Sequence, residues 1–292
     1  MVDIISSEIL KKIYSARPED SRKYDFGSLL VIGGSEYYSG APALSAFAAF
    51  SAGVDMVRVA APKRAGDIIA AFSPILATTS LEGERFNKAH LSVLEEAVDS
   101  MKTVACGKCA VVIGGGIGRS QETIDAVREF ILAVDIPMVI DADAVRALAV
   151  GPEAFAGKSL LLTPHIREFE ALTGNNIDGK TDDQKIEIVA NQAKSLGMTI
   201  VLKGKVDIIS DGNTTVASKT GNALMTKGGM GDTLAGIAGA LLARGASLFD
   251  AGCAATYING AAGELAGAMR GESVTAMDLI DQIQNVLPKY KY

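Results

Sequence analysis

Two patterns of hydrophobic residues alternate along the chain: short unbroken apolar runs, and longer stretches in which apolar residues recur every three or four positions. The unbroken runs are typical of strands that are buried on both faces of a parallel sheet. The spaced pattern predicts amphipathic helices. The predicted strands are residues 29–32, 56–60, 75–81, 110–113, 138–140, 160–163 and 199–202. The predicted helices are residues 6–14, 42–52, 91–101, 120–133, 182–196, 246–268 and 275–286, with two more that contain Phe169 and Leu172 or begin near residue 232.

This regular alternation predicts an α/β fold, in which helices cover both faces of a mostly parallel sheet. The exception is a β-hairpin, which residues 208–209 and 214–216 would form around 211–213. No segment rich in Pro, Gly or Ser divides the chain. We therefore expect one domain over residues 1–292.

Residues 225–236 (MTKGGMGDTLAG) form a glycine loop that leads directly into a predicted helix. Glycine backbone can approach a ligand closely, and the N–H groups at the start of a helix attract anions such as phosphate. Asp232 would lie beside a phosphoryl group in this loop, where it could take a proton from an attacking hydroxyl. An aspartate in the first turn also commonly caps a helix. The loop alone leaves both interpretations open.

Other polar residues follow predicted strands, at the edge where open α/β sheets bind ligands. Asp141 and Asp143 follow one strand and His165 follows the next, although the two aspartates would serve equally well as helix caps. A second glycine turn, residues 114–118 (GGGIG), also lies between a strand and a helix. Together with Asp141 it resembles part of a dinucleotide-binding unit, but the full glycine fingerprint is absent because Arg119 occupies its last position.

Two further motifs have simpler interpretations. Residues 174–181 (GNNIDGKT) match the spacing of a phosphate-binding P-loop, yet they follow a helix and not a strand, and Gly174 is well placed to end that helix. Cys106 and Cys109 form a CxxC pair, but no further zinc ligands are near them in sequence, so we interpret the pair as structural.

Composition excludes several classes of function. The net charge is −6 and no cluster of basic residues with aromatics occurs, so we expect no nucleic-acid partner. No apolar run is long enough to span a membrane, and the first residues do not resemble a secretory signal. Three cysteines, an odd number, argue against a disulfide framework. We therefore expect a cytoplasmic protein.

Seven short motifs, in this order, resemble one family closely. It is the family of ADP/ATP-dependent NAD(P)H-hydrate dehydratases, nicotinamide nucleotide repair enzymes with a ribokinase-like, three-layer α/β/α fold. The resemblance extends from about residue 24 to about residue 268. The motifs are residues 33–35, 39–43, 114–118, 139–144, 162–165, 202–204 and 229–232.

The resemblance implies a lyase reaction in which ADP or ATP phosphorylates the hydroxyl of the 6S hydrate of NADH or NADPH, and phosphate then leaves to restore the dihydronicotinamide. It implies that Asp232 activates the hydroxyl, and that Gly229 and Gly231 donate N–H groups to the transferring phosphoryl. The implied nucleotide site contains Lys203, Gly204, Lys205, Val206, Asp207 and Gly231. The implied site for the hydrate contains Ala41, Gly116, His165 and Asp232. Mg²⁺ is an expected cofactor, although the sequence does not identify its ligands.

The chain departs from the family at several positions. Met230 replaces the usual threonine, Gly115 stands where proline is common, and Ile166 with Arg167 replace a frequent Pro-Gly. The first change removes a hydroxyl, and the others bear on affinity for the dinucleotide. Fused bacterial members carry an epimerase domain before this one, so the resemblance implies a separate epimerase here. It also implies a homo-oligomer, with a tetramer as one candidate.

Three rival functions remain at this stage. A kinase of the same superfamily acting on a small alcohol, such as a vitamin precursor, would use the same aspartate and anion site. A non-catalytic nucleotide-binding protein would keep the fold but would not need Asp232. An oxidoreductase that binds its dinucleotide at residues 114–141 would lack the full glycine fingerprint and would leave the loop at residues 225–236 unexplained.

Overall fold

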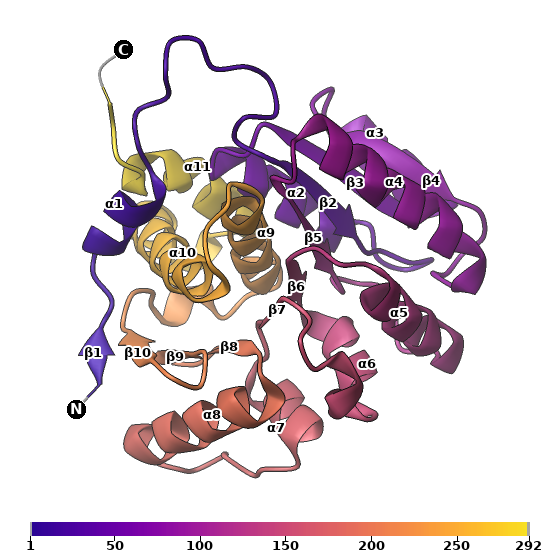
Figure 1. The fold of residues 1–292 in the computed structure, drawn as a ribbon. Helices are drawn as coiled ribbons and strands as arrows, with labels where there is room; N and C mark the ends of the chain where they lie inside the picture. Colours follow the sequence, from indigo (N-terminus) through magenta and orange to yellow (C-terminus); the bar gives the residue numbers. More distant parts are fainter. Residues whose placement is uncertain (1, 291–292) are drawn as a thin grey trace.

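The computed structural model describes residues 2–290 and is built on one ten-stranded sheet (Figure 1). The strand order is β1-β10-β9-β8-β7-β6-β5-β2-β3-β4, and only β9 pairs with its neighbours in the antiparallel sense. The strands are β1 (Asp3–Ile4), β2 (Ser28–Ile32), β3 (Met56–Pro62), β4 (Ala77–Leu81), β5 (Cys109–Ile113), β6 (Met138–Ile140), β7 (Leu160–Leu162), β8 (Thr199–Leu202), β9 (Asp207–Ser210) and β10 (Thr215–Ser218).

Helices cover both faces of this sheet. The helices are α1 (Glu8–Ile13), α2 (Gly40–Ser51), α3 (Lys63–Phe72), α4 (Leu91–Val104), α5 (Gln121–Ala133), α6 (Val145–Ala149), α7 (Ile166–Thr173), α8 (Asp182–Leu196), α9 (Met230–Ala243), α10 (Leu248–Arg270) and α11 (Ala276–Val286). Residues of α1, α2, α3, α9, α10 and α11 share one apolar core with the sheet, while α4 to α8 form the cores on its other face. Figure 1 shows α9 and α10 on one side of β8 to β10 and α7 and α8 on the other. The three-layer α/β/α prediction is confirmed.

The central strand β2 shows why its sequence has no polar position. All five of its residues are buried. Leu29 and Val31 belong to the core on the α9 side, whereas Leu30 and Ile32 belong to the core on the α5 side. Because successive side chains of a strand point to opposite faces, only an unbroken apolar run satisfies both cores.

Small residues bring α9 unusually close to its neighbours. A Cβ added to Gly236 would lie 2.1 Å from the carbonyl oxygen of Ser45 in α2, and one added to Gly239 would lie 2.3 Å from a methyl of Val112 in β5. Both approaches are too short for any side chain larger than hydrogen. The glycines therefore fix the position of α9, and with it the position of the residues at its start.

The sequence predicted most elements but missed some. The parallel strands and the antiparallel hairpin of β9 and β10 are confirmed. The strand predicted over residues 75–81 begins two residues later, at Ala77. The predictions omitted β1, α3 and α6. Of these, β1 and α6 are short, with two and five residues, and a few residues carry little periodicity.

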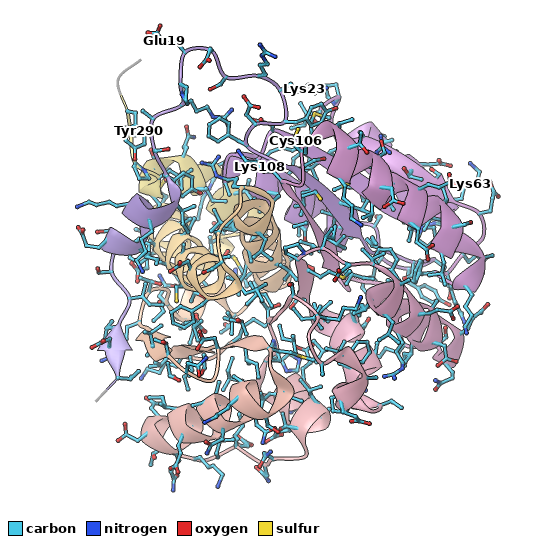
Figure 2. All side chains as sticks on the ribbon, in the orientation of Figure 1. Glu19, Lys23, Lys63, Cys106, Lys108 and Tyr290 are labelled. Atoms are coloured by element: carbon cyan, nitrogen blue, oxygen red, sulfur yellow. The ribbon has the colours of Figure 1, made fainter. Side chains whose placement is uncertain are left out.

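The amino ends of the parallel strands lie at the edge of the sheet opposite to the ends that precede the glycine turns. Figure 2 labels Cys106 and Lys108 at this edge, beside the N-terminal segment that carries Lys23. Lys108 Nζ donates a hydrogen bond of 2.8 Å to the carbonyl oxygen of Asp25, which fastens that segment to the start of β5. Cys106 is exposed and Cys109 is buried. The CxxC pair thus belongs to this junction.

Within residues 2–290, none of the helices combines the length and the apolar character that crossing a membrane requires.

Candidate functional site

The carboxyl ends of five neighbouring parallel strands meet at one edge of the sheet. Gly33, Gly114 and Asp141 directly follow β2, β5 and β6, while Thr163 and Lys203 follow β7 and β8. Sequence order reverses between β2 and β5, where β3 and β4 extend one way and β6 to β8 the other. Such a switch point opens a crevice outside the strand ends, and open α/β sheets bind ligands there.

The first turn of α9 lies at this edge and leaves N–H groups available. The helix is preceded by Gly229, whose φ of 94° favours glycine. A Cβ at Gly229 would also lie 2.7 Å from Leu44 and 2.8 Å from Ala276. The first hydrogen bond of the helix joins the N–H of Thr233 to the carbonyl oxygen of Gly229, so the N–H groups before Thr233, including that of Gly231, are not used within the helix. The geometry fits an anion.

Asp232 is the third residue of α9 and lies against the glycine turn after β5. A Cβ added to Gly115 would be 2.8 Å from Oδ1 of Asp232 and 3.2 Å from the Cβ of Ala41. One added to Gly116 would be 3.7 Å from the Cβ of Ala41. Of the four residues predicted to contact the hydrate, Asp232, Ala41 and Gly116 therefore lie around one point.

Asp232 does not cap its helix. The N-cap position belongs to Gly229, and no side-chain hydrogen bond closes this helix end. The pKa of the Asp232 carboxyl is raised to about 7, mainly by burial and also by the nearby charge of Asp141, while the charge of Lys203 lowers it. A carboxylate whose pKa lies near neutrality suits a general base that must take a proton and later release it.

A buried ion pair lies beside this aspartate. Asp141 is 3% exposed, and its Oδ1 accepts hydrogen bonds of 2.8 Å from Lys203 Nζ and 2.7 Å from Thr163 Oγ1. Burial alone would lower the pKa of the Lys203 ammonium, but the charges of Asp141 and Glu168 outweigh it, so the pKa is raised and the group stays protonated. Although Asp141 has the N-cap position of a short 3-10 helix (Ala142–Ala144), its side chain makes no capping bond. The capping interpretation of Asp141 is wrong.

Asp143 supports the glycine turn. Its carboxylate accepts hydrogen bonds from the N–H of Gly118, at 3.3 Å, and from Arg119 Nε, at 2.6 Å. The Asp143 carboxylate thus ties the end of the glycine turn to the segment after β6. Asp143 is a positioning residue for the turn, and it acts on neither a helix end nor the point around Asp232.

A cavity of about 1310 Å³ opens on the other side of Gly231 and Lys203. All six residues predicted for the nucleotide line it: Lys203, Gly204, Lys205, Val206, Asp207 and Gly231. The loop is held by Asp207, whose Oδ1 accepts a 2.8 Å hydrogen bond from the N–H of Gly204. Burial raises the pKa of Asp207 to about 6. The size and position of this cavity suit a nucleotide whose phosphates point to the start of α9.

Sequence reasoning missed most of the far wall of this cavity. No motif marked residues 219–223, Thr256, Asn259 and Gly260, which form it together with residues 225–227 at the start of the glycine loop. Asn259 is nearly buried and joins the wall to the anion loop, because its Nδ2 donates to the carbonyl oxygen of Met230 and its Oδ1 accepts from Thr233 Oγ1. An asparagine among the buried small and apolar residues of α10 was the available signal.

His165 has a structural task and also lines the large cavity. Its Nδ1 accepts a 3.2 Å hydrogen bond from the N–H of Glu168, and Glu168 Oε2 accepts one of 2.9 Å from the N–H of His165, which together cap α7. The imidazole is exposed and lines the large cavity. Asp232, Ala41 and Gly116 do not line that cavity, so His165 lines a different part of the site from the other three residues predicted for the hydrate.

The remaining motifs resolve as expected from their context. Gly174 ends α7 with φ of 71°, and Thr181 caps α8 through its hydroxyl, so residues 174–181 connect two helices and form no P-loop.

Met230 is 5% exposed and belongs to the core on the α9 side. Among the described residues, no three side chains of His, Cys, Asp or Glu are grouped so that they could hold a metal ion.

Fold and site together define the class of protein. A ribokinase-like superfamily protein from Enterococcus faecalis has the same fold, with a TM-score of 0.82 and 23% identity over 98% of this chain and 95% of that one. The ADP/ATP-dependent NAD(P)H-hydrate dehydratase from Bacillus subtilis, co-crystallised with ATP and Mg²⁺, has a TM-score of 0.80 and 24% identity over 98% and 97% of the two chains. The protein is therefore ribokinase-like in fold.

The family follows from sequence. Residues 29–285 match the model of the NAD(P)H-hydrate dehydratase family, and the chain belongs to that family. An ADP-dependent (S)-NAD(P)H-hydrate dehydratase from Cenarchaeum symbiosum is 34% identical over 98% of this chain and 97% of the relative. A bifunctional NAD(P)H-hydrate repair enzyme from Pyrobaculum aerophilum is 40% identical over 94% of this chain. The chain covers 53% of that relative, about half its length.

Proposed function

We propose that the protein dehydrates the 6S hydrate of NADH or NADPH, with ADP or ATP as the phosphoryl donor. The observation that carries the proposal is the position of Asp232, which has a pKa of about 7 and lies between the glycine turn after β5 and the anion-binding start of α9. Family membership supports the same reaction.

The proposed roles follow the two parts of the site. The hydrate would lie over Ala41 and Gly116 and reach toward His165, with its hydroxyl at Asp232. The adenine nucleotide would occupy the cavity lined by residues 203–207. Its terminal phosphoryl would then meet the N–H groups of Gly229 and Gly231 between the two ligands. Oriented N–H donors stabilise the charge that develops on a transferring phosphoryl.

The chemistry proceeds in two steps. Asp232 takes the proton of the ring hydroxyl while the oxygen of that hydroxyl attacks the terminal phosphorus of the nucleotide, and AMP or ADP leaves. The C–O bond of the phosphate ester then breaks, as the electron pair of the ring nitrogen forms a C=N bond and phosphate departs. Loss of a proton from the adjacent ring carbon restores the dihydronicotinamide. Phosphorylation is needed because hydroxide is a poor leaving group.

Mg²⁺ fits this site only as a companion of the nucleotide. The described residues offer no group of three carboxylate, imidazole or thiolate ligands, and Mg²⁺ commonly relies on substrate phosphates with one or two carboxylates. A bound Mg²⁺ would neutralise phosphate charge. The B. subtilis structure with ATP and Mg²⁺ supports this cofactor.

The proposal extends to the setting of the reaction. Longer relatives are bifunctional repair enzymes, and a separate epimerase would supply the 6S hydrate to this chain as its functional partner. All three cysteines are free, in keeping with a reducing cytoplasm. We also propose that residues 1–292 form a single domain and that the protein is a homo-oligomer.

The test is recovery of NADH absorbance from purified hydrate in the presence of Mg²⁺, with ADP and ATP supplied separately. We expect recovery that requires a nucleotide and that falls by about 10²–10⁴-fold in Asp232→Asn, the range typical of general-base catalysis. A stable phosphate ester without recovered absorbance would instead show a kinase. Absence of any reaction from folded protein would overturn the proposed dehydratase.

A further inference from the structure

A second, smaller pocket lies next to the candidate site and is strongly basic. It has a volume of about 200 Å³, and its lining includes Arg119, Arg146 and Arg167 together with His165 and Glu168. The three arginines come from three separate segments: the end of the glycine turn, α6, and α7. None of the proposed catalytic steps uses this pocket.

The protein neutralises only part of the positive charge in this pocket. Arg119 is paired with Asp143, and Glu168 is engaged with His165. Arg146 and Arg167 are both exposed, and neither forms an ion pair with any of residues 2–290. Guanidinium groups bind phosphate through paired hydrogen bonds, so unpaired arginines around a small hollow are typical of a phosphate site.

The pocket adjoins the place proposed for the hydrated dinucleotide. His165 lines both this pocket and the large cavity. Arg119 lies three residues after Gly116, and its pKa is raised mainly by its bond to Asp143, with smaller effects from Glu168 and Tyr38. A Cβ at Gly116 would lie 2.8 Å from the Cβ of Tyr38. Arg119 therefore links the pocket to the glycine turn over which the substrate would lie.

The volume of the pocket limits what it can hold. Whole ligands of drug size occupy cavities of about 300–1,000 Å³, so a smaller hollow takes one end of a ligand. One family departure contributes to this hollow, because Arg167 stands where many members have glycine. The positive charge that Arg167 adds to this small pocket is therefore a feature of this chain and not of the family in general.

We infer that Arg119, Arg146 and Arg167 bind a phosphate group of the hydrated dinucleotide. The inference rests on the proposed function for the identity of the ligand. The phosphate could come from two parts of that ligand: the 2′-phosphate that only NADPH carries, or the pyrophosphate that NADH and NADPH share. Both present the same chemistry to the three guanidinium groups, and experiment distinguishes them.

The test measures binding of NADPH and NADH by calorimetry, so that it does not depend on turnover. The variant is Arg146→Gln with Arg167→Gln, and the matched control is Arg22→Gln, an exposed arginine in the segment before β2. We expect the double variant to weaken dinucleotide binding at least tenfold and to reduce its salt dependence, with the control unchanged. A loss confined to NADPH assigns the 2′-phosphate, and an equal loss for both assigns the pyrophosphate.

A second readout separates this inference from the proposed reaction. KM for the hydrates of NADPH and NADH should rise with the same selectivity in the double variant, with kcat nearly unchanged. Unaltered binding of both dinucleotides in the double variant would overturn the inference, even in an active dehydratase. Conversely, arginine-dependent binding by a wild-type protein without dehydratase activity would retain the phosphate pocket and overturn only the reaction.

Discussion

Lys203 Nζ lies 2.8 Å from Oδ1 of Asp141, and the pair joins the ends of two strands, β6 and β8, that are not neighbours. The same ammonium lies 3.4 Å from the point where a Cβ of Gly231 would be, beside the first turn of α9. Lys203 therefore faces a carboxylate on one side and the anion loop on the other. Burial is the main cause of the raised pKa of Asp232, while Asp141 raises it further and Lys203 lowers it, so the ion pair adjusts the proton affinity of the proposed base.

The first prediction concerns pH. Because the pKa of Asp232 is about 7, and the deprotonated form is the proposed base, kcat/KM should rise with pH up to about 7 and then level off. Below that point the slope should approach tenfold per pH unit. The measurement is kcat/KM for NADH hydrate between pH 5 and 9. A profile that falls as pH rises through this interval would contradict a role for Asp232 as base.

The second prediction concerns stability. A carboxyl whose folded pKa is raised above its unfolded value stabilises the protein only at low pH, and this advantage is lost as pH rises through the folded pKa. For Asp232 the values are 3.8 and about 7, so the buried charge costs stability above pH 7. Asp232→Asn should therefore be more stable than wild type at pH 8, by about 2–4 kcal/mol.

Urea unfolding at several pH values checks this prediction. The advantage of Asp232→Asn should shrink steadily from pH 7 toward pH 4, since wild-type Asp232 becomes protonated in the folded state. Asp143→Asn is a suitable control because the structure gives Asp143 its own partners, Arg119 and Gly118. Equal stability of Asp232→Asn and wild type at pH 8 would show that the carboxylate is well solvated.

The third prediction separates the two tasks of Lys203. Lys203→Met leaves Asp141 buried without its cation, which should cost about 3 kcal/mol or more of stability. It also removes the charge that lowers the pKa of Asp232, so the rise of kcat/KM should move to higher pH. Adding Asp141→Leu should restore most of the stability, but not the affinity for nucleotide phosphate.

Comparison of these variants distinguishes structure from chemistry. Unfolding gives the coupling energy between Lys203 and Asp141, and titration with ADP gives the affinity for nucleotide. If the double variant regained full ADP affinity, the ammonium would serve the fold alone, and its position near Gly231 would have no part in nucleotide binding.

Unbroken apolar runs predicted the central strands because these strands are buried on both faces, and the structure confirms this for β2. They could not predict β1, whose two residues are exposed. The helix α3 was not predicted. Its apolar side is narrow, with Ala65, Gly66 and Ile69 as its buried residues.

Some features of the site could also be predicted from the sequence, and others could not. Residues that follow strands, such as Asp141 and Lys203, were recognisable by position, since parallel strands end at one edge. Their pairing was not recognisable, because 62 positions separate them along the chain. The arginine pocket was likewise hidden, as its three arginines come from different elements and form no motif. Spacing reveals what lies close in sequence, whereas charge compensation depends on the fold.

The last prediction concerns the close approach of Gly115 to Asp232. A Cβ at this position would be 2.8 Å from Asp232 Oδ1 and 3.2 Å from Ala41, so Gly115→Ala must displace the carboxylate or the turn. Because misplacement of a reacting group by about 1 Å can cost about a hundredfold in rate, kcat should fall by roughly ten- to a hundredfold. Stability should change by less than about 1 kcal/mol, since the φ of Gly115 is not positive.

Gly40→Ala provides the matched control, because a Cβ there meets no atom within 4 Å. Both changes add one methyl near the start of α2, but only the change at Gly115 presses on the carboxylate. In the pH profile, Gly115→Ala should also shift the apparent pKa, whereas Gly40→Ala should leave it near that of wild type. If the two variants lost activity equally, contact with Asp232 would not be the cause, and the placement of the base against the glycine turn would have to be abandoned.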